Sequence, residues 1–366
     1  MIKWEGHIPM ILKFSSLLIA GTFVYLPLLV NAHHSMSEFD RSVLVEIEGV
    51  ISRISWKNPH VLLEVTSTGE AGTLLTWNLE GSAVSGQRRH GLTGDEMSVG
   101  DMVRVAGSPS TRRDQYLQAH HVLLANGTEL LVGRIREPRW SNTAIGAENW
   151  MGVPVDEVAE IAAARGNGIF RVWSQGTRAW YFADLLGPAN YKVNESAAAI
   201  AAEWDDIADN PLIECVAPGM PALMGNPYPM EFVQVGEDIE LRFEEFDVVR
   251  TIHMGNELPD PANVEASHHG YSVGYWEGET LVVDTFRVSW PYFDRVGVLQ
   301  TENVAINEQF TAEDDGSRLS YVLTVNEPAA LVEPFVWDAY FIWKPGEEVG
   351  RYECTLEEWA STENTL

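Results

Sequence analysis

The sequence predicts a mainly β protein made of a small OB-like barrel, a connector with short helices and an up-and-down antiparallel β-barrel. Apolar and polar residues alternate with a period of two over residues 42–132 and again over 230–346. This is the pattern of strands that have one buried face. Between the two blocks the alternation stops and alanine-rich segments appear, which marks a change of architecture.

The first block, residues 33–133, is expected to form the OB-like domain. It contains five alternating segments, the strand number of an OB-like barrel: VLVEIEGVISRISW, VLLEVTST, TLLTWNLE, DMVRVAGSPS and HVLLANGTELLVG. Gly49 is expected to place a bulge in the long first strand. The segment SAVSGQRRHGLTGDEM follows the third strand, at the position where this fold usually carries a helix.

Residues 134–213 are interpreted as a connector with short helices. The segments VDEVAEIAAARG and ESAAAIAAEWDDIADNP have the alanine and acidic content of helices, and the second is expected to end before Pro211. The aromatic residues of this region indicate that it packs on a domain, because a solvated linker is poorer in Trp and Phe.

Residues 214–366 are expected to form the second domain. At least eight alternating segments follow one another with short turns such as VGED and WEGET. Consecutive strands joined in this way favour an up-and-down antiparallel barrel, and a barrel of that strand number closes around a pocket. A β-sandwich is the alternative architecture for the same pattern.

Residues 1–32 are interpreted as a signal peptide. Lys3 and Lys13 precede the apolar run LLIAGTFVYLPLLV, and Ala32 ends a V-N-A cleavage site. The run is shorter than the ~20 residues that a membrane-spanning helix needs, which makes a retained anchor the less favoured alternative. We therefore expect a periplasmic or secreted protein that begins at His33 and has no stable membrane insertion after cleavage.

Charge and cysteine content limit the partners and the compartment. The formal net charge is −29 at pH 7, which argues against nucleic acid and anionic lipid as partners. The two cysteines, Cys215 and Cys354, lie near the two ends of the second domain. In an oxidising compartment they are expected to form a disulfide, with two unpaired thiols as the alternative. The oligomeric state does not follow from the sequence.

Several motifs resemble known families. HHSMSEFD, ISWKNPHVLLEV and SVGDMVRVAGSP resemble an uncharacterised family of exported bacterial proteins whose mature chain opens with a His pair. GMPALMGNPYPMEFVQ, DVVRTIHMG and GYSVGYWEGETLVVDT resemble a module that commonly follows it and whose strands are similar to lipocalin-like domains. The resemblance implies a lipocalin-like second barrel and brings no established activity with it.

The leading functional hypothesis is that the C-terminal barrel binds a small, largely apolar or aromatic molecule. Alternating aromatic residues can line such a pocket, although they are also ordinary core residues. The candidate ligand-binding residues are Arg250, Trp276, Trp290, Trp337 and Tyr340. Because neighbours on a strand face opposite sides, Arg250 and His253 are not expected to share the barrel interior.

A second hypothesis is a cofactor-independent acid/base enzyme, such as an isomerase, lyase or hydrolase. His253 and Asp284 are its candidate catalytic pair, because a histidine beside a carboxylate can transfer protons near neutral pH. Nucleotide binding and serine-hydrolase or metalloprotease activity are not favoured. A scaffold in a cell-envelope complex is a further possibility, which a large exposed apolar patch would support.

A third functional hypothesis is copper binding at the mature N-terminus. His33 would offer an α-amino nitrogen and a ring nitrogen together, a chelate that suits Cu(II). His34, His60 and His121 are the further candidate ligands. The alternative for His60 is a structural role, in which it starts a strand directly after the Asn58–Pro59 turn.

Overall fold

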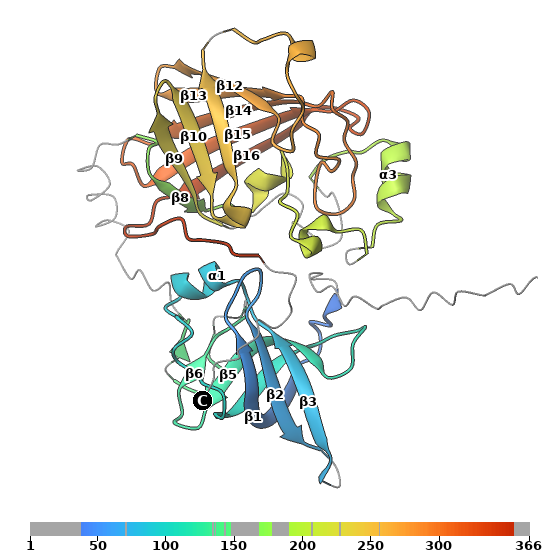
Figure 1. The fold of residues 1–366 in the computed structure, drawn as a ribbon, viewed down its shortest axis with the longest axis vertical. Coiled ribbons are helices and arrows are strands. Elements are labelled where there is room, and N and C mark those ends of the chain that lie inside the picture. Colours follow the sequence, from blue (N-terminus) through green and yellow to red (C-terminus); the bar gives the residue numbers. More distant parts are fainter. Residues whose placement is uncertain are drawn as a thin grey trace, which may run out of the picture. The chain divides into compact units, whose positions relative to one another are not determined.

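The computed structural model describes residues 38–354, except 70–71, 134, 136, 143, 148–167, 178–189, 206–207, 227 and 256. Two β-barrels and few helices make up this part of the chain, which confirms the mainly β fold class (Figure 1). The expected signal peptide and the helix expected in VDEVAEIAAARG lie outside the described residues. None of the described helices is long and apolar enough to cross a membrane.

Five strands form the first barrel, as the sequence predicts. Four antiparallel pairings and one parallel pairing, between β3 and β5, close the ring in the order β1-β2-β3-β5-β4. This ring confirms the expected OB-like barrel. The strands are β1 (Val45–Ser55), β2 (Leu62–Thr68), β3 (Leu74–Glu80), β4 (Met102–Pro109) and β5 (Tyr116–Leu124).

Gly49 lies in β1 but does not form the expected bulge. The register of β1 against β2 shifts further along, between Ile51 and Arg53. Glycine is required at position 49 for another reason: a Cβ atom there would collide with the carbonyl oxygen of Thr66 on β2. The glycine therefore permits a close approach of two backbones, and the bend of β1 comes from residues that carry side chains.

A short helix, α1 (Val84–Arg89), lies between β3 and β4, where the fold class predicts one. Its first backbone N–H, that of Val84, donates to Asn58 Oδ1 at 3.0 Å. Asn58 thereby satisfies one of the N–H groups that a first helical turn leaves without a partner. Two short strands, β6 (Glu129–Leu130) and β7 (Ala144–Ile145), extend the sheet beyond β5.

Nine strands form the second barrel, a closed ring in the order β10-β11-β12-β13-β14-β15-β16-β8-β9 (Figure 1). The closure confirms a barrel and excludes the β-sandwich. The strands are β8 (Val172–Gln175), β9 (Met230–Val235), β10 (Asp238–Phe243), β11 (Val249–Met254), β12 (Tyr271–Glu277), β13 (Thr280–Phe286), β14 (Ala305–Ala312), β15 (Arg318–Asn326) and β16 (Phe335–Ile342).

One pairing departs from the up-and-down pattern. Strands β11 and β12 are parallel, with Ile252 opposite Ser272 and His253 opposite Val273. Two parallel neighbours cannot be joined by a tight hairpin, because the chain must return to the starting end of the sheet. Residues 255–270, with the short helix η7 (Pro261–Asn263), make this return and so create a long loop beside the wall.

Strand β8 comes from the segment interpreted as a connector. It pairs with β16 on one side and β9 on the other, and thereby closes the wall. The connector also contains α3 (Glu195–Ala201), which begins at the N-cap Asn194 and ends earlier than the expected boundary before Pro211. The other short helices within the described residues are η4 (Pro211–Glu214), η5 (Ala222–Gly225) and η6 (Glu245–Asp247).

Aromatic rings pack against one another inside the second barrel. Tyr321 is central, with ring centroids of Phe310, Trp337 and Phe341 at 4.8, 5.8 and 5.6 Å from its own. Phe232 continues the contact on the far side of Phe310, at 5.1 Å. All five side chains are buried, so these rings belong to a packed interior.

The expected disulfide joins Cys215 and Cys354, whose Cα atoms lie 5.8 Å apart. Cys215 follows η4, before the first strands of the 230–342 wall, and Cys354 lies after the last of them. The bridge therefore ties the segment that enters this part of the barrel to the segment that leaves it.

Candidate functional site

The interior of the second barrel contains a complete polar network around Arg250. The side chains of Arg250 and its ion-pair partner Glu308 are 1% and 0% exposed. All five guanidinium N–H groups have acceptors. Nε donates to Ser272 Oγ at 2.9 Å, Nη1 to Glu308 Oε1 at 3.1 Å and Met220 Sδ at 3.7 Å, and Nη2 to Thr285 Oγ1 at 2.7 Å and Glu308 Oε2. Arg250 therefore has no N–H left for a ligand in this arrangement.

The carboxylate of Glu308 accepts from a third donor group. Tyr321 donates its hydroxyl to Glu308 Oε1 at 3.0 Å. Burial raises the pKa of Tyr321 well above its ordinary value, and the nearby Glu308 charge raises it further. Tyr321 therefore keeps its proton and acts as a permanent donor in the network.

Ser272 belongs to the sequence GYSVG, residues 270–274, which has the GxSxG spacing of a hydrolase nucleophile elbow. That elbow needs an exposed serine on a turn between a strand and a helix. Ser272 instead lies within β12, is buried, and its Oγ contacts Arg250 and Thr285. The surroundings of Ser272, rather than the spacing, argue against a serine hydrolase.

His253 and Asp284 both lie on the outer face of the barrel. Arg250 and Ile252 point inward from β11, so His253, the next residue, points outward, as the alternation predicts. In the sheet, His253 is opposite Val273 on β12, and Val273 is opposite Asp284 on β13. Val273 therefore separates the two proposed catalytic residues, and they do not form a hydrogen bond.

Each of the two residues has a different partner. His253 Nδ1 lies 3.0 Å from Asp238 Oδ2, and the His253 ring stacks on Tyr271 with centroids 4.6 Å apart. The Met254 backbone N–H, followed by His253, lowers the pKa of Asp238. Asp284 Oδ1 accepts a hydrogen bond from Asn307 Nδ2 at 2.8 Å.

Asp238 was not predicted, although a hairpin argument leads to it. Asp238 starts β10, and in an antiparallel hairpin the start of one strand lies beside the end of the next. The end of β11 carries His253 and Met254. The turn between the strands therefore identifies the carboxylate partner of His253 better than the distance in sequence does.

A pocket of about 380 Å³ lies on this outer face, beside the loop that follows β11. Its lining residues are Gly255, Leu258, Val273, Tyr275 and Asp284. They come from three parts of the chain: the loop after β11, β12 and β13. The pocket thus has an apolar wall, one phenol ring and one carboxylate.

The other candidate ligand-binding residues are not brought together. Trp290 and Trp337 are buried, Trp290 beside His268 and Trp337 against Tyr321. Trp276 is 43% exposed. Tyr340 carries the Arg318 guanidinium over its ring at 4.0 Å. None of the four lines the outer pocket.

The proposed metal ligands do not form a site within the described residues. His60 Nδ1 lies 3.0 Å from the carbonyl oxygen of Gly81 and 3.3 Å from Glu80 Oε1, whereas His121 Nδ1 lies 3.0 Å from Glu129 Oε1. In the described part of the chain, no three His, Cys, Asp or Glu side chains are grouped so that they could hold a metal ion. His33 and His34 lie outside it.

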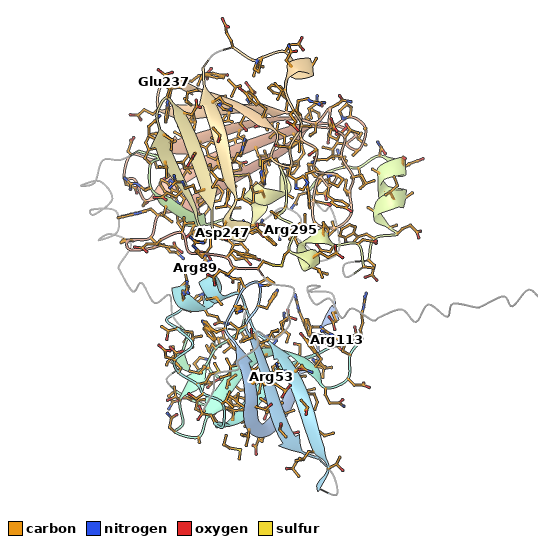
Figure 2. The ribbon with its side chains drawn as sticks, in the orientation of Figure 1. Arg53, Arg89, Arg113, Glu237, Asp247 and Arg295 are labelled. Carbon is orange, nitrogen blue, oxygen red and sulfur yellow. A yellow bond between two sulfur atoms is a disulfide. The ribbon has the colours of Figure 1, made fainter. Side chains whose placement is uncertain are left out.

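Buried Glu80 next to His60 belongs to a second polar group of the first barrel. Tyr116 donates its hydroxyl to Glu80 Oε2 at 3.1 Å, and burial raises the pKa of Glu80. The guanidinium of Arg113 (labelled in Figure 2) lies 3.3 Å from the centre of the Tyr116 ring and pairs with Glu38. This group ties the first described residues to β3 and β5.

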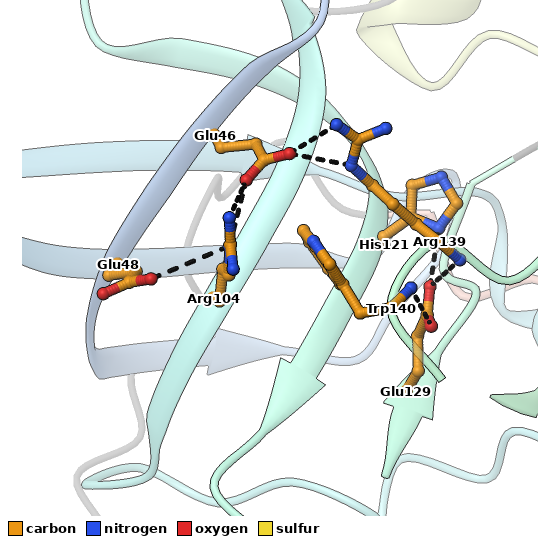
Figure 3. A network of polar contacts seen from close by, with 7 residues as sticks. All are labelled: Glu46, Glu48, Arg104, His121, Glu129, Arg139 and Trp140. Carbon is orange, nitrogen blue, oxygen red and sulfur yellow. Dashed lines mark hydrogen bonds and ion pairs between the residues drawn. The ribbon is translucent and has the colours of Figure 1, made fainter. Parts of the chain in front are cut away.

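Glu129 of β6 is the centre of a network that sequence reasoning missed (Figure 3). Its carboxylate accepts the backbone N–H groups of Arg139, Trp140 and Ser141 at 2.7, 2.9 and 2.8 Å. Burial raises the pKa of Glu129, but these hydrogen bonds and His121 outweigh burial and hold it below its usual value. Burial also lowers the pKa of His121, partly offset by Glu129.

The loop held by Glu129 extends to a pair of arginines (Figure 3). Arg139 Nε and Arg104 Nε donate to the Glu46 carboxylate at 2.8 and 2.9 Å. The two guanidinium groups, Arg139 first, lower the pKa of Glu46. Both arginines also lie over the Trp140 ring, at 5.8 and 5.2 Å from its centroid. These contacts fasten residues 139–141 to β1 and β4.

Comparison with known families covers only the start of the chain. Residues 24–116 match the family model described as a family of unknown function, DUF6152. The match is consistent with the uncharacterised family that the first-block motifs resemble. No curated protein matches the chain.

Proposed function

We propose that the C-terminal barrel binds a small molecule with an apolar or ring-containing body in the outer pocket. The observation that carries this proposal is the pocket itself, which combines Leu258 and Val273 with the Tyr275 ring and the Asp284 carboxylate. Its volume of about 380 Å³ falls within the usual range for small-molecule sites, which combine an apolar lining with a few fixed polar groups.

The outer face supports binding better than the barrel interior does. Inside, the aromatic rings contact one another and every N–H of Arg250 already has an acceptor. Outside, the return loop between the parallel strands β11 and β12 supplies a wall that a plain hairpin would not provide. The proposed binding site is therefore the outer pocket and not the barrel interior.

We further infer that the protein acts in the periplasm or outside the cell. The disulfide between Cys215 and Cys354 is typical of an oxidising compartment. The basic residues, apolar run and V-N-A site within residues 1–32 support export.

Ligand-observed NMR with a library of ring-containing fragments tests the binding proposal. We expect hits whose signals weaken when Leu258 is replaced by Ser, because the apolar wall is lost. Val332→Ser is the matched control, since Val332 is 64% exposed and does not line the pocket. Hits that are unchanged in Leu258→Ser, or a library without any hit, would contradict the proposal.

An acid/base enzyme remains a second candidate because of one observation. Asp238, His253, Val273 and Asp284 lie on one outer face across four neighbouring strands, and the last two line the pocket. His253 does not line the pocket, so a substrate held at Asp284 would have to extend past Val273 to reach the imidazole. If this candidate is correct, His253→Gln abolishes turnover of a bound ligand while its affinity stays within about twofold, as expected for a proton-transfer residue.

A further inference from the structure

We infer that the outer pocket selects a small organic cation, a molecule in which an ammonium group is attached to an apolar or ring-containing body. This inference rests on the proposed function, since it names the class of ligand for the same pocket.

Asp284 is the one ionisable carboxylate among the lining residues, and it has no cationic partner among the described residues. Its Oδ1 accepts a hydrogen bond from the Asn307 amide, a neutral donor, at 2.8 Å. The amide fixes the direction of the carboxylate without neutralising its charge. One oxygen, Oδ2, is left for a ligand.

Several other carboxylates of this barrel lie beside cations, whereas Asp284, within the described part of the chain, does not. Glu308 pairs with Arg250 in the interior, and three more pairs are Glu245 with Arg295 at 2.7 Å, Glu240 with Arg242 at 2.7 Å and Glu302 with Arg287 at 2.8 Å. Even Asp238, in the same row of the sheet, has His253 as its partner. The pocket thus contains a carboxylate whose counter-charge has to come from outside the protein or from solvent.

The charges that act on the pocket ring are also negative. Burial, followed by the carboxylates of Asp284 and Glu277, raises the pKa of Tyr275. A neutral phenol ring attracts a cation through its face, and the adjacent carboxylate adds to that attraction. The formal charge of −29 favours the approach of cations over anions.

The composition of the wall distinguishes an organic cation from a metal ion. A metal ion needs several oxygen or nitrogen ligands, and the described residues show no group of three that could hold one. Leu258 and Val273 offer apolar contact instead. A molecule that places its charge at Asp284 and its ring or alkyl part against Leu258 uses both features.

The test compares benzylamine with its neutral counterpart benzyl alcohol on the full chain, by NMR titration at low ionic strength. We expect benzylamine to bind at least about tenfold more tightly, because only its ammonium group adds an ion pair to the hydrogen bond that either probe can donate to Asp284, and we expect added salt to weaken the amine alone. In Asp284→Asn, which preserves the shape of the side chain, the amine should fall to the affinity of the alcohol. Asp338→Asn, an exposed position on β16, is the control and should leave both affinities unchanged.

The possible results separate this inference from the proposed function. Equal affinities of the two probes, or an Asp284→Asn variant that keeps the preference for the amine, would overturn cation selection while leaving pocket binding in place. If neither probe nor any fragment binds, pocket binding is overturned as well. Thermal melts of Asp284→Asn and Asp338→Asn that match the unsubstituted protein exclude a folding defect as the cause of a lost preference.

Discussion

In the first barrel, the buried carboxylate of Glu129 lies in a short strand and accepts hydrogen bonds from a loop, whereas in the second barrel a carboxylate and a guanidinium lie in the interior. Glu129 holds residues 139–141 through three backbone N–H groups. Arg250 and Glu308 instead face each other from β11 and β14, across the inside of the nine-strand wall.

The strand number accounts for this difference. The diameter of a barrel grows with the number of strands. A five-strand barrel is therefore narrow, and the side chains that point inward fill it completely. The interior of a nine-strand barrel is wider, and long side chains from distant strands can meet there. A charged pair is tolerated in such an interior only when its donors and acceptors are all satisfied, as they are around Arg250.

Removing the disulfide should produce the largest difference in stability between the two barrels. Both cysteines belong to the second domain, and the bridge spans 139 residues. In the chain-entropy model a closed loop of that length contributes roughly 5 kcal/mol, which the double variant Cys215→Ser/Cys354→Ser should lose. Hydrogen exchange should show the loss in peptides from β9 to β16 and not in those from β1 to β5. An equal loss in both barrels would contradict the comparison.

Breaking the interior ion pair should have the next largest effect. Arg250→Met leaves Glu308 buried without its cation and should lower the free energy of unfolding of the second barrel by about 4 kcal/mol. Adding Glu308→Leu should restore much of that stability, because an apolar pair of similar volume replaces the ionic one. Chemical denaturation measures both changes.

An exposed ion pair of the same barrel is the control for that experiment. Arg242 and Glu240 are 43% and 25% exposed, so Arg242→Met should cost less than about 1 kcal/mol. If Arg250→Met costs no more than this control, the interior network does not stabilise the barrel.

Glu129→Gln tests the corresponding group of the first barrel. The amide keeps the size of the side chain but weakens hydrogen bonds to three N–H groups and to His121, with an expected loss of about 3 kcal/mol. The loss should appear as faster hydrogen exchange in the segment from β5 to β7. Glu48→Gln, at a side chain that is 73% exposed, should leave exchange unchanged. Similar results for the two variants would reject the anchoring role of Glu129.

The smallest expected effect is a pH dependence of the stability of the first barrel, caused by the buried His120. Its Nε2 lies 3.0 Å from Ser108 Oγ, and burial, followed by the charges of His121 and Arg41, lowers its pKa from 6.5 to about 4. The folded state therefore binds the proton less readily than the unfolded state. Stability should be fully present above pH 6.5 and decrease as the pH falls toward 4, by about 2 kcal/mol between pH 7 and pH 5.

His120→Asn removes this titration, and the variant should show a flatter dependence of first-barrel stability on pH. His268→Asn replaces an exposed histidine of the second domain and should leave that dependence unchanged. An unaltered pH profile in His120→Asn would mean that another group causes the acid sensitivity.

The parts of the fold that depend on local pattern could be predicted from the sequence. Period-two alternation gave both barrels and the opposite faces of Arg250 and His253, whereas the short helix α1 was expected from its position in the fold class. Strand β8 could not be recognised from the sequence, because its four residues are too few to show a period-two alternation. It pairs through only two residues with β16 and two residues with β9. The parallel pairing of β11 and β12 also depends on tertiary structure, since a long loop is compatible with either direction.

The candidate site was predictable only in part, for a geometrical reason. His253 and Asp284 do lie on the same face of the sheet. Their separation by Val273 depends on the order of strands around the barrel, which alternation does not contain. The pocket depends on the return loop and therefore on the same unknown order. Residue type suggested the candidate residues, and strand order decided which of them meet.

The short strand β8 has a consequence for the order in which the chain folds. One of its partner strands lies far along the sequence, since Ser174 and Gln175 pair with Ile342 and Phe341 of β16. Contacts of such high sequence separation slow folding, because a long loop must close before they form. During synthesis the ring cannot be completed until β16 has left the ribosome. Until then β8 and β15, the two strands that pair with β16, each present an unpaired edge, so a chain cut short before β16 exposes edges prone to intermolecular pairing.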